Sequence, residues 1–351
     1  MTLVGNKEVW EQLLVAKYSA LKDKRPLPHT LLSGAAGCGK TSTARELAAQ
    51  SGSQFLVIAP ESIKTRDDVL NIIQQLDHRG YDRYGVLKEN AVINHPILFV
   101  DEVHRMPITG QEHLGIVMEE WAIPVDARKI KTNIFDQFDL DCKDRLRWCP
   151  KFTMIGATTN DGLLSKPFKD RFKMRFLFNT YTLEESIEIV KSHASRLNIS
   201  IEDGAAKEIA KRGRGVPRII VGLLERCRDF MRSIGYDTLN TETTRASFLL
   251  FKIDDIGMTD IDVKILKALY NSNAPLGLDN LSVIVNESKQ TIEETIEPYL
   301  IQQGFILRAS RGRTITDNGK MYLIRGGYIE AGIDEADDWV DIPTDYYKRG
   351  A

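Results

Sequence analysis

The chain has 351 residues, of which 42% are hydrophobic and 27% charged, and its formal net charge is −2. These fractions are typical of a globular protein in water, and the length exceeds what one hydrophobic core usually supports, so we expect two or three domains. The sequence has no run of about 18 apolar residues and no secretory signal pattern, which predicts a cytoplasmic protein that does not bind membranes. The near-neutral charge argues against a globally basic surface, so any DNA contact must be local.

The four cysteines give no sign of a metal cluster or a disulfide framework. They form no Cys-x-x-Cys pair, and no histidines stand at zinc-ligand spacing from them. We therefore expect ordinary reduced thiols at Cys38, Cys142, Cys149 and Cys227.

The first half of the chain alternates between short apolar runs and helical patterns. An amphipathic helix over 7–23 ends at a segment with two prolines, 24–29. Strands are expected over 30–32, 55–59, 97–100, 152–157 and 175–178, with helices over 40–50 and 66–76. Alternation of this kind predicts an α/β fold with a mostly parallel sheet covered by helices.

The pattern changes twice in the second half. Helices alone are expected over 183–197, 202–211, 217–233 and 242–251, which indicates a small helical domain. Between 259 and 323, three helices precede a hairpin over 304–317 with a basic turn, the order of a winged helix. The predicted domains are therefore 1–180, 181–255 and 256–326, followed by an acidic tail over 327–351.

A phosphate-binding loop lies between the first strand of the sheet and the helix that follows it. Residues 34–41, Gly-Ala-Ala-Gly-Cys-Gly-Lys-Thr, fit the pattern G-x-x-x-x-G-K-[ST]. Glycines let the backbone wrap phosphates, Lys40 reaches the β- and γ-phosphates, and Thr41 can bind Mg²⁺. The predicted nucleotide-binding residues are Gly34, Gly37, Cys38, Gly39, Lys40, Thr41 and Ser42, with ATP and Mg²⁺ as cofactors.

A second acidic motif supports this prediction. The apolar strand 97–100 ends in Asp101 and Glu102, where Asp101 can anchor Mg²⁺ and Glu102 can polarise the attacking water. A strand ending in this pair can also be a simple helix cap. Its combination with the phosphate loop favours catalysis.

Five motifs together resemble those of RuvB, the AAA+ ATPase of Holliday-junction branch migration, in that family's order. The resemblance extends over residues 4–323, and the last two motifs separate RuvB from ATPases in general. The motifs are Asp-Glu-Val-His-Arg-Met at 101–106, Ile-Gly-Ala-Thr-Thr-Asn at 155–160, Pro-Phe-Lys-Asp-Arg-Phe at 167–172, Gly-Val-Pro-Arg-Ile at 215–219 and Glu-Pro-Tyr-Leu-Ile-Gln-Gln-Gly-Phe at 297–305.

The resemblance implies a role for each matched residue. Thr159 would be sensor 1, Arg171 an arginine finger acting in a neighbouring subunit's ATP site, and Arg218 sensor 2. Plainer alternatives are a turn cap for Thr159, a surface ion pair for Arg171 and a solvated helix residue for Arg218. Val4 and Gly5 resemble part of the family's adenine contact.

The resemblance also implies partners. A finger acting in trans favours a closed ring, and RuvB-like proteins are typically hexameric. In the winged helix, residues 288–300 occupy the recognition-helix position, and Arg308, Arg311 and Arg313 on the wing would contact DNA phosphates independently of sequence. A wing that docks on protein instead of DNA is the alternative.

Two regions depart from the family pattern. The family carries a short hairpin that docks on RuvA. Here the corresponding region, residues 121–150, is longer and has Trp121, Phe135, Phe138 and Trp148 set among charges. We therefore expect a partner-binding surface there, for a RuvA-like protein that differs from the standard one. Residues 64–91 are also longer than expected. Asn160 follows sensor 1 where the family usually has arginine, and the basic segment before Val4 is missing.

We therefore predict an ATP-driven DNA motor for branch migration of Holliday junctions. A clamp-loader-like ATPase would share the phosphate loop, sensors and finger but would not normally carry a winged helix. A nucleotide-gated protein scaffold is a third hypothesis, which Glu102 and Arg171 argue against.

Overall fold

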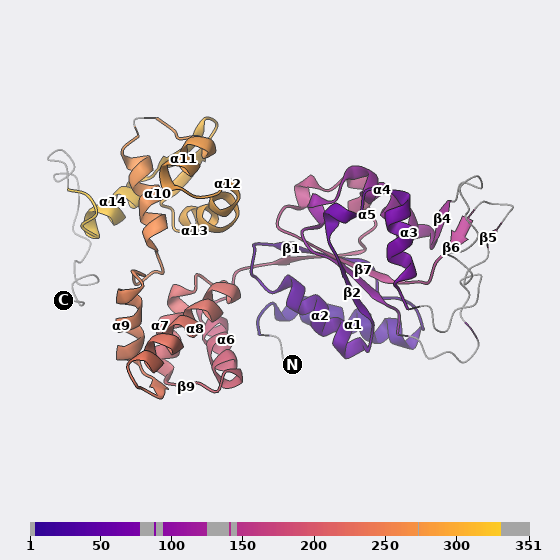
Figure 1. Cartoon of the computed structure of the whole chain (residues 1–351), viewed down its shortest axis with the longest axis horizontal. Helices are drawn as coiled ribbons and strands as arrows, with labels where there is room; N and C mark the ends of the chain where they lie inside the picture. The colour runs from indigo at the N-terminus through magenta and orange to yellow at the C-terminus, as the bar shows by residue number, and fades with distance from the viewer. Residues whose placement is uncertain are drawn as a thin grey trace. The chain divides into compact units, whose positions relative to one another are not determined.

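The computed structural model describes residues 4–77, 88, 94–124, 140–141, 146–272 and 274–330. The chain divides into two compact units, Met1–Tyr181 and Thr182–Ala351 (Figure 1). In the described part of the chain, no helix is both long and apolar enough to span a lipid bilayer.

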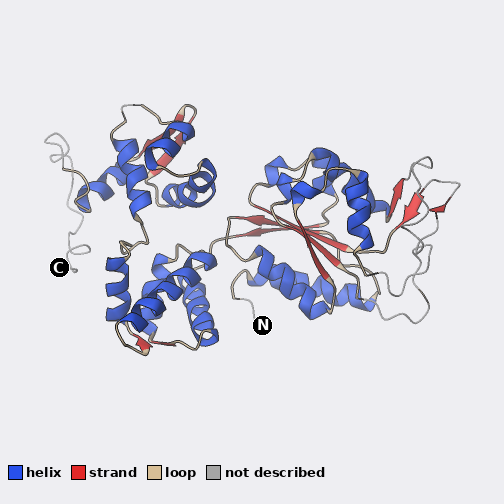
Figure 2. Ribbon diagram, viewed as in Figure 1, coloured by secondary structure: helices blue, strands red, loops and turns tan. Residues whose placement is uncertain are grey.

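The centre of the first unit is a five-stranded sheet in the order β2-β3-β7-β1-β8, with every pairing parallel. Figure 2 shows helices on both sides of this sheet. The predicted α/β fold is confirmed, and each strand lies within two residues of its predicted bounds. The strands are β1 (Thr30–Gly34), β2 (Phe55–Ile58), β3 (Ile97–Val100), β7 (Thr153–Thr158) and β8 (Met174–Phe178).

Strand β3 is apolar at every position because both of its faces are buried. Ile97 and Phe99 face a core that includes Leu13 and Leu47, whereas Leu98 and Val100 face the opposite core. Successive side chains of a strand point to opposite faces, so a strand covered on both sides needs apolar residues throughout. The first polar residues after β3, Asp101 and Glu102, therefore emerge at the carboxyl edge of the sheet.

Within the described residues of the first unit, five helices cover the two faces of the sheet. Two of them, α4 and α5, were not predicted, because α4 contains two glycines and α5 is only five residues long. Packing of Leu114, Val117 and Phe168 into the core holds them in place. One face is covered by α1 (Lys7–Lys22) and α2 (Lys40–Ser51), and the other by α3 (Arg66–Gln74), α4 (Ile108–Glu120) and α5 (Lys166–Asp170). The connecting segments contain the 3-10 turns η1 (Pro60–Ser62), η2 (Val103–Arg105) and η4 (Asp161–Leu163).

Three short strands form a separate antiparallel sheet in the order β4-β6-β5, within the region predicted to bind a partner. They are β4 (Ala122–Pro124), β5 (Leu140–Asp141) and β6 (Leu146–Trp148). Trp121 does not stand free: its ring lies 5.5 Å from those of both His29 and Phe152. Phe135, Phe138 and Cys142 lie outside the described residues, as do most of residues 78–93 and the acidic tail beyond 330.

The second unit begins with the four predicted helices, α6 (Leu183–Arg196), α7 (Asp203–Arg212), α8 (Pro217–Ser233) and α9 (Thr241–Leu250). The expectation of helices alone is wrong, because β9 (Ser200–Ile201) and β10 (Thr238–Leu239) pair in parallel. Strands of two residues are too short to produce an alternating pattern, so they left no signal in the sequence.

The described residues that follow α9 form a winged helix, as predicted, extended by a helix after the hairpin. A single recognition helix over 288–300 was expected, but a π-helical turn over Ile292–Ile296 interrupts it. Pro298 has no N–H to donate to the carbonyl four residues earlier, which favours the wider turn. The elements are α10 (Asp260–Tyr270), α11 (Leu278–Val285), α12 (Lys289–Thr291), α13 (Glu297–Gln302), β11 (Ile306–Ala309), β12 (Gly312–Ile315) and α14 (Asp317–Arg325).

Candidate active site

The phosphate loop joins β1 to α2 and depends on its glycines. Gly34 has φ +140°, and a Cβ there would come within 2.4 Å of the carbonyl oxygen of Phe178 on the neighbouring strand. Gly39 precedes the first turn of α2 with φ +91°. Both conformations are open to glycine and costly for other residues. The loop leads directly into α2, and the first turn of a helix offers N–H groups that have no partner within the helix, which suits phosphate binding.

Lys40 is folded onto this loop. Its side chain is largely buried, and Nζ donates hydrogen bonds to the carbonyl oxygens of Gly34 (2.7 Å) and Ala35 (2.9 Å). These contacts hold the ammonium group over the loop. Cys38 is a packing residue: its side chain is fully buried, and burial raises the pKa of its thiol although the charge of Lys40 opposes this. The hydroxyl of Tyr181 donates to the Cys38 carbonyl at 3.2 Å.

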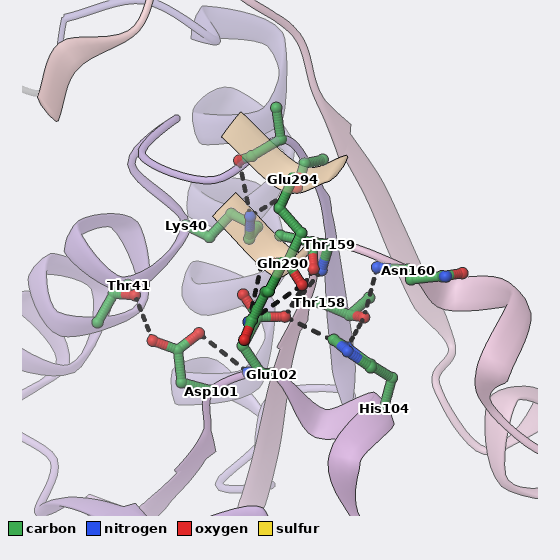
Figure 3. A network of polar contacts seen from close by, with 12 residues as sticks. Lys40, Thr41, Asp101, Glu102, His104, Thr158, Thr159, Asn160, Gln290 and Glu294 are labelled. Atoms are coloured by element: carbon green, nitrogen blue, oxygen red, sulfur yellow. Dashed lines mark hydrogen bonds and ion pairs between the residues drawn. The ribbon is translucent and has the colours of Figure 1, made fainter. Parts of the chain in front are cut away.

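The oxygen atoms suited to Mg²⁺ lie together. The hydroxyl of Thr41 is 3.3 Å from Oδ2 of Asp101, and Oδ1 of Asp101 accepts a hydrogen bond from the backbone N–H of Glu102 (3.1 Å). Hydroxyl and carboxylate oxygens are the ligands that Mg²⁺ prefers. The residues present therefore fit a magnesium ion shared between the start of α2 and the end of β3 (Figure 3).

Glu102 has an unusual backbone and a well-defined carboxylate. Its φ and ψ are 45° and 49°, a left-handed conformation that is rare for residues other than glycine and is often found at functional sites. Oε2 accepts hydrogen bonds from the backbone N–H (3.1 Å) and the hydroxyl (2.9 Å) of Thr159. The predicted catalytic glutamate and the predicted sensor 1 are thus in direct contact (Figure 3).

Two further residues belong to this cluster and were not assigned roles from the sequence. Nδ1 of His104 lies 3.2 Å from Oε2 of Glu102 and 2.9 Å from the hydroxyl of Thr158. That hydroxyl also accepts the backbone N–H of Asn160 at 3.0 Å. His104 stands two residues after Glu102 in the turn η2, and that proximity was the signal that could have identified it.

Arg171 lies at the end of α5, away from the cluster just described. Nη1 donates to the carbonyl of Pro167 (2.7 Å), and Nη2 is 3.3 Å from Oε2 of Glu119. Its side chain is 24% exposed, and its buried Nε has no hydrogen-bond partner among the residues that the structure describes. Arg171 and Glu119 line an open cleft of about 520 Å³ together with Arg25, His29, Met118 and Trp121.

The other nucleotide-site predictions are less constrained by contacts. Ser42 is exposed in the first turn of α2, and Val4 and Gly5 are half-buried ahead of α1. Arg218 is exposed in the first turn of α8, in the second unit. Roles of these residues in nucleotide binding stay predictions.

The three arginines predicted to contact DNA differ in their surroundings. Arg308 and Arg313 both bind the buried carboxylate of Glu297, with nitrogen–oxygen distances of 2.7–3.0 Å. The side chain of Arg313 is only 12% exposed, whereas that of Arg308 is 50% exposed. Arg311 is exposed in the turn between β11 and β12. Arg313 therefore supports the wing itself, whereas Arg311 and the outer part of Arg308 are exposed to solvent.

Three family models match the chain in order. Residues 1–177 match the Holliday junction DNA helicase RuvB P-loop domain, residues 181–254 the RuvB AAA lid domain and residues 255–324 the RuvB C-terminal winged helix domain. Together they span the sheet with its phosphate loop, the four-helix part and the winged helix.

Curated relatives and solved structures agree. The RuvB subunit of the Holliday junction branch migration complex of Clostridium kluyveri is 35% identical over 317 residues, 90% of this chain and 83% of that protein. That of a Wolbachia strain from Drosophila simulans is 33% identical over 320 residues, 91% of each chain. The structure of the Thermotoga maritima RuvB Holliday junction branch migration motor has a TM-score of 0.74 and 31% identity, and the alignment covers 91% of this chain and 95% of that one. This protein belongs to the RuvB family.

Proposed function

We propose that this protein is an ATP-hydrolysing DNA motor that drives branch migration of Holliday junctions. The observation that carries the proposal is a pair of contacts beside the phosphate loop, Thr41 with Asp101 and Thr159 with Glu102. In the same loop, Nζ of Lys40 donates to the carbonyl of Gly34. This catalytic arrangement occurs in a chain of the RuvB family that also has that family's winged helix. The winged helix favours this function over a clamp-loader-like ATPase.

The residues of the site divide the chemistry of hydrolysis. Lys40 and the loop N–H groups bind the phosphates, and Thr41 and Asp101 hold Mg²⁺, which supplies positive charge to the phosphate oxygens when bound. Glu102 orients and polarises the attacking water, and Thr159 senses the γ-phosphate. The contact between these two residues links water activation to the presence of ATP.

Arg171 acts in trans in this proposal. In the described part of the chain, its side chain donates a hydrogen bond to the Pro167 carbonyl and forms an ion pair with Glu119, and neither residue belongs to the phosphate site. An arginine finger supplies positive charge to the transition state of phosphoryl transfer. Because every site then needs a neighbour, only a closed ring completes all sites, and we propose a hexamer.

The winged helix contacts DNA through the wing in this proposal. Arg311 and the exposed part of Arg308 would bind phosphates, and such contacts carry no sequence preference, as a motor that moves along any DNA requires. A RuvA-like junction-binding protein would dock at residues 121–150, which include the sheet β4-β6-β5.

Mixing two inactive subunits tests the trans mechanism. Arg171→Ala and Lys40→Ala proteins, each inactive alone, should recover part of their ATPase when mixed, because one kind of mixed interface then has both residues. Absence of recovery at any mixing ratio would argue against a finger acting in trans.

Separation of a fluorescent synthetic four-way junction tests the motor function. The purified protein should separate the junction only with ATP and intact Lys40, and a RuvA-type partner should stimulate it if residues 121–150 still dock one. ATP hydrolysis with an intact junction under both conditions would instead indicate another DNA or protein substrate.

A further inference from the structure

His104 is fixed between two elements of the active site. It lies in η2, directly after Glu102, and its side chain is 8% exposed. Nδ1 contacts the hydroxyl of Thr158, which is fully buried at the end of β7, and Oε2 of Glu102. The imidazole therefore connects the catalytic carboxylate to a rigid strand of the central sheet (Figure 3).

The surroundings of Nδ1 determine which atom carries its proton. A carboxylate oxygen only accepts hydrogen bonds, so an unprotonated Nδ1 would place its lone pair against Oε2 of Glu102 at 3.2 Å. A protonated Nδ1 can instead donate to Oε2 and to the hydroxyl of Thr158 together. The Nδ1–H tautomer is therefore the one compatible with both neighbours, since it places a proton between Nδ1 and the two oxygens.

The hydroxyl of Thr159 cannot hold the Glu102 carboxylate by a hydrogen bond throughout the reaction. Its hydroxyl has one proton, which in this structure points to Oε2 of Glu102 at 2.9 Å. If Thr159 senses the γ-phosphate, that proton turns to a phosphate oxygen when ATP is bound, and Glu102 loses a donor. The polar groups that stay beside Oε2 of Glu102 are the backbone N–H of Thr159, which donates to it at 3.1 Å, and Nδ1 of His104, which lies 3.2 Å away.

We propose that His104 is a positioning residue for Glu102. Its Nδ1–H keeps the Glu102 carboxylate at the carboxyl end of β3 and β7 while the hydroxyl of Thr159 is used by the nucleotide. His104 does not touch the reacting atoms; it acts through Glu102. This inference rests on the proposed role of Glu102 as the residue that orients the water.

The test compares two replacements of similar size in the full-length protein. His104→Asn keeps an N–H donor near the position of Nδ1, and His104→Leu removes it. We measure steady-state ATP hydrolysis with junction DNA and binding of a fluorescent ATP analogue. Thermal melting checks that each variant is folded. Glu102→Gln is assayed in parallel.

We expect His104→Leu to lower kcat on the order of tenfold to a hundredfold, because a displaced catalytic group has effects of this size. KM for ATP and analogue affinity should stay within about twofold, because His104 acts on the hydrolysis step and not on binding. His104→Asn should recover most of the loss. A folded His104→Leu protein with normal kcat overturns the inference, as does a His104→Asn protein as impaired as His104→Leu.

The parallel variant separates this inference from the proposed function. Normal turnover by Glu102→Gln would remove the proposed role of Glu102 and the inference with it. An inactive Glu102→Gln protein together with a fully active His104→Leu protein would remove only the inference about His104.

Discussion

Arg171 lies directly against Gly115 of α4: a Cβ at residue 115 would come within 3.1–3.2 Å of Nε, Cδ and Cζ of the arginine. The glycine leaves room for the arginine to lie along the helix and reach Glu119, one turn further on, at 3.3 Å. In this position the side chain is three-quarters buried, and within the described ranges its Nε has no hydrogen-bond partner. The proposed finger is therefore held against its own subunit by its contacts with Pro167, Glu119 and Gly115.

Gly115→Ala should lower the ATPase activity without lowering the stability of the fold. Alanine favours a helix interior by about 0.5–1 kcal/mol over glycine, so the melting temperature should stay the same or rise. The new methyl group pushes the arginine away from α4, so ATPase of the assembled protein should fall several-fold, roughly 1 kcal/mol in transition-state stabilisation. Steady-state ATPase and thermal melting measure both effects.

The mixed-subunit assay shows whether such a loss involves the finger. Mixing Gly115→Ala with Lys40→Ala protein should raise the ATPase per intact site. The gain should be smaller than the one seen when Arg171→Ala is mixed with Lys40→Ala. Unchanged ATPase at every protein concentration would contradict the assignment of this contact to catalysis.

Glu297→Ala should destabilise the winged helix by about 3 kcal/mol, because removing one partner of a buried ion pair leaves the other charge uncompensated. Glu297 is buried beneath the wing and binds both Arg308 and Arg313. Burial opposes ionisation of Glu297, but hydrogen bonds from the two arginines outweigh it and lower the pKa of the carboxyl. Urea unfolding of the full-length protein measures the loss.

Glu293→Ala is the matched control. Glu293 also contacts Arg308, at 3.2 Å, but its side chain is 48% exposed. Exposed ion pairs contribute about 0–1 kcal/mol, so this variant should unfold close to wild type. Equal effects of the two substitutions would mean that Glu297 is no more than a surface partner of the wing.

The contrast between Glu297 and the phosphate loop shows what the sequence could reveal. The residues of the phosphate loop are consecutive in the sequence, and Asp101 and Glu102 directly follow an apolar strand. A motif search along the chain therefore predicts their chemistry. The pairing of Glu297 with Arg313 joins the start of α13 to β12, 16 positions further along the chain, and no periodicity in the sequence predicts it. The sequence therefore predicts a basic surface from these arginines, although two of them, Arg308 and Arg313, pair with a buried carboxylate.

The same reasoning explains why His104 received no role. Its place in the motif was visible, but its contact with Thr158 depends on the parallel pairing of β3 with β7, which brings the ends of strands far apart in the chain together. Sequence patterns predict that strands exist more readily than which strands are neighbours.

The first unit should lose stability as the pH falls from about 6.5, because His29 is buried in its neutral form. Nε2 donates to the carbonyl of Met118 and Nδ1 accepts the N–H of Met154, both at 2.9 Å. Burial lowers the pKa of His29 from 6.5 to about 4. Below pH 6.5 the unfolded chain takes up a proton that the folded chain refuses, so stability declines towards pH 4, by about 2 kcal/mol at pH 5.

His29→Gln checks the origin of this decline. Glutamine can donate to the Met118 carbonyl but does not titrate, so the variant should lose about 2 kcal/mol less than wild type between pH 6.5 and 5. Urea unfolding at the two pH values, followed by tryptophan fluorescence, gives the difference. An identical pH dependence in both proteins would assign the decline to other groups.

A buried ion pair connects the loop before α8 to the winged helix within the second unit. Arg214 contacts both carboxylate oxygens of Asp262 (3.2 and 2.5 Å) and donates twice to the carbonyl of Gly257 (3.0 and 2.6 Å). Its guanidinium also lies 4.2 Å from the ring centre of Tyr299. Arg214 stands four residues before Arg218, so this pair is well placed to pass movements of the proposed sensor 2 to the winged helix.

Arg214→Lys should weaken that connection while keeping the charge. A lysine cannot make the planar set of four hydrogen bonds, so we expect a loss of about 2 kcal/mol in unfolding free energy and a several-fold loss of DNA stimulation, with basal ATPase near wild type. Arg245→Lys is the control, because Arg245 pairs with Glu208 from a side chain that is 63% exposed. It should leave DNA stimulation intact. If Arg214→Lys lowers stability but ATPase responds to DNA as in wild type, the pair holds the unit together without transmitting nucleotide state.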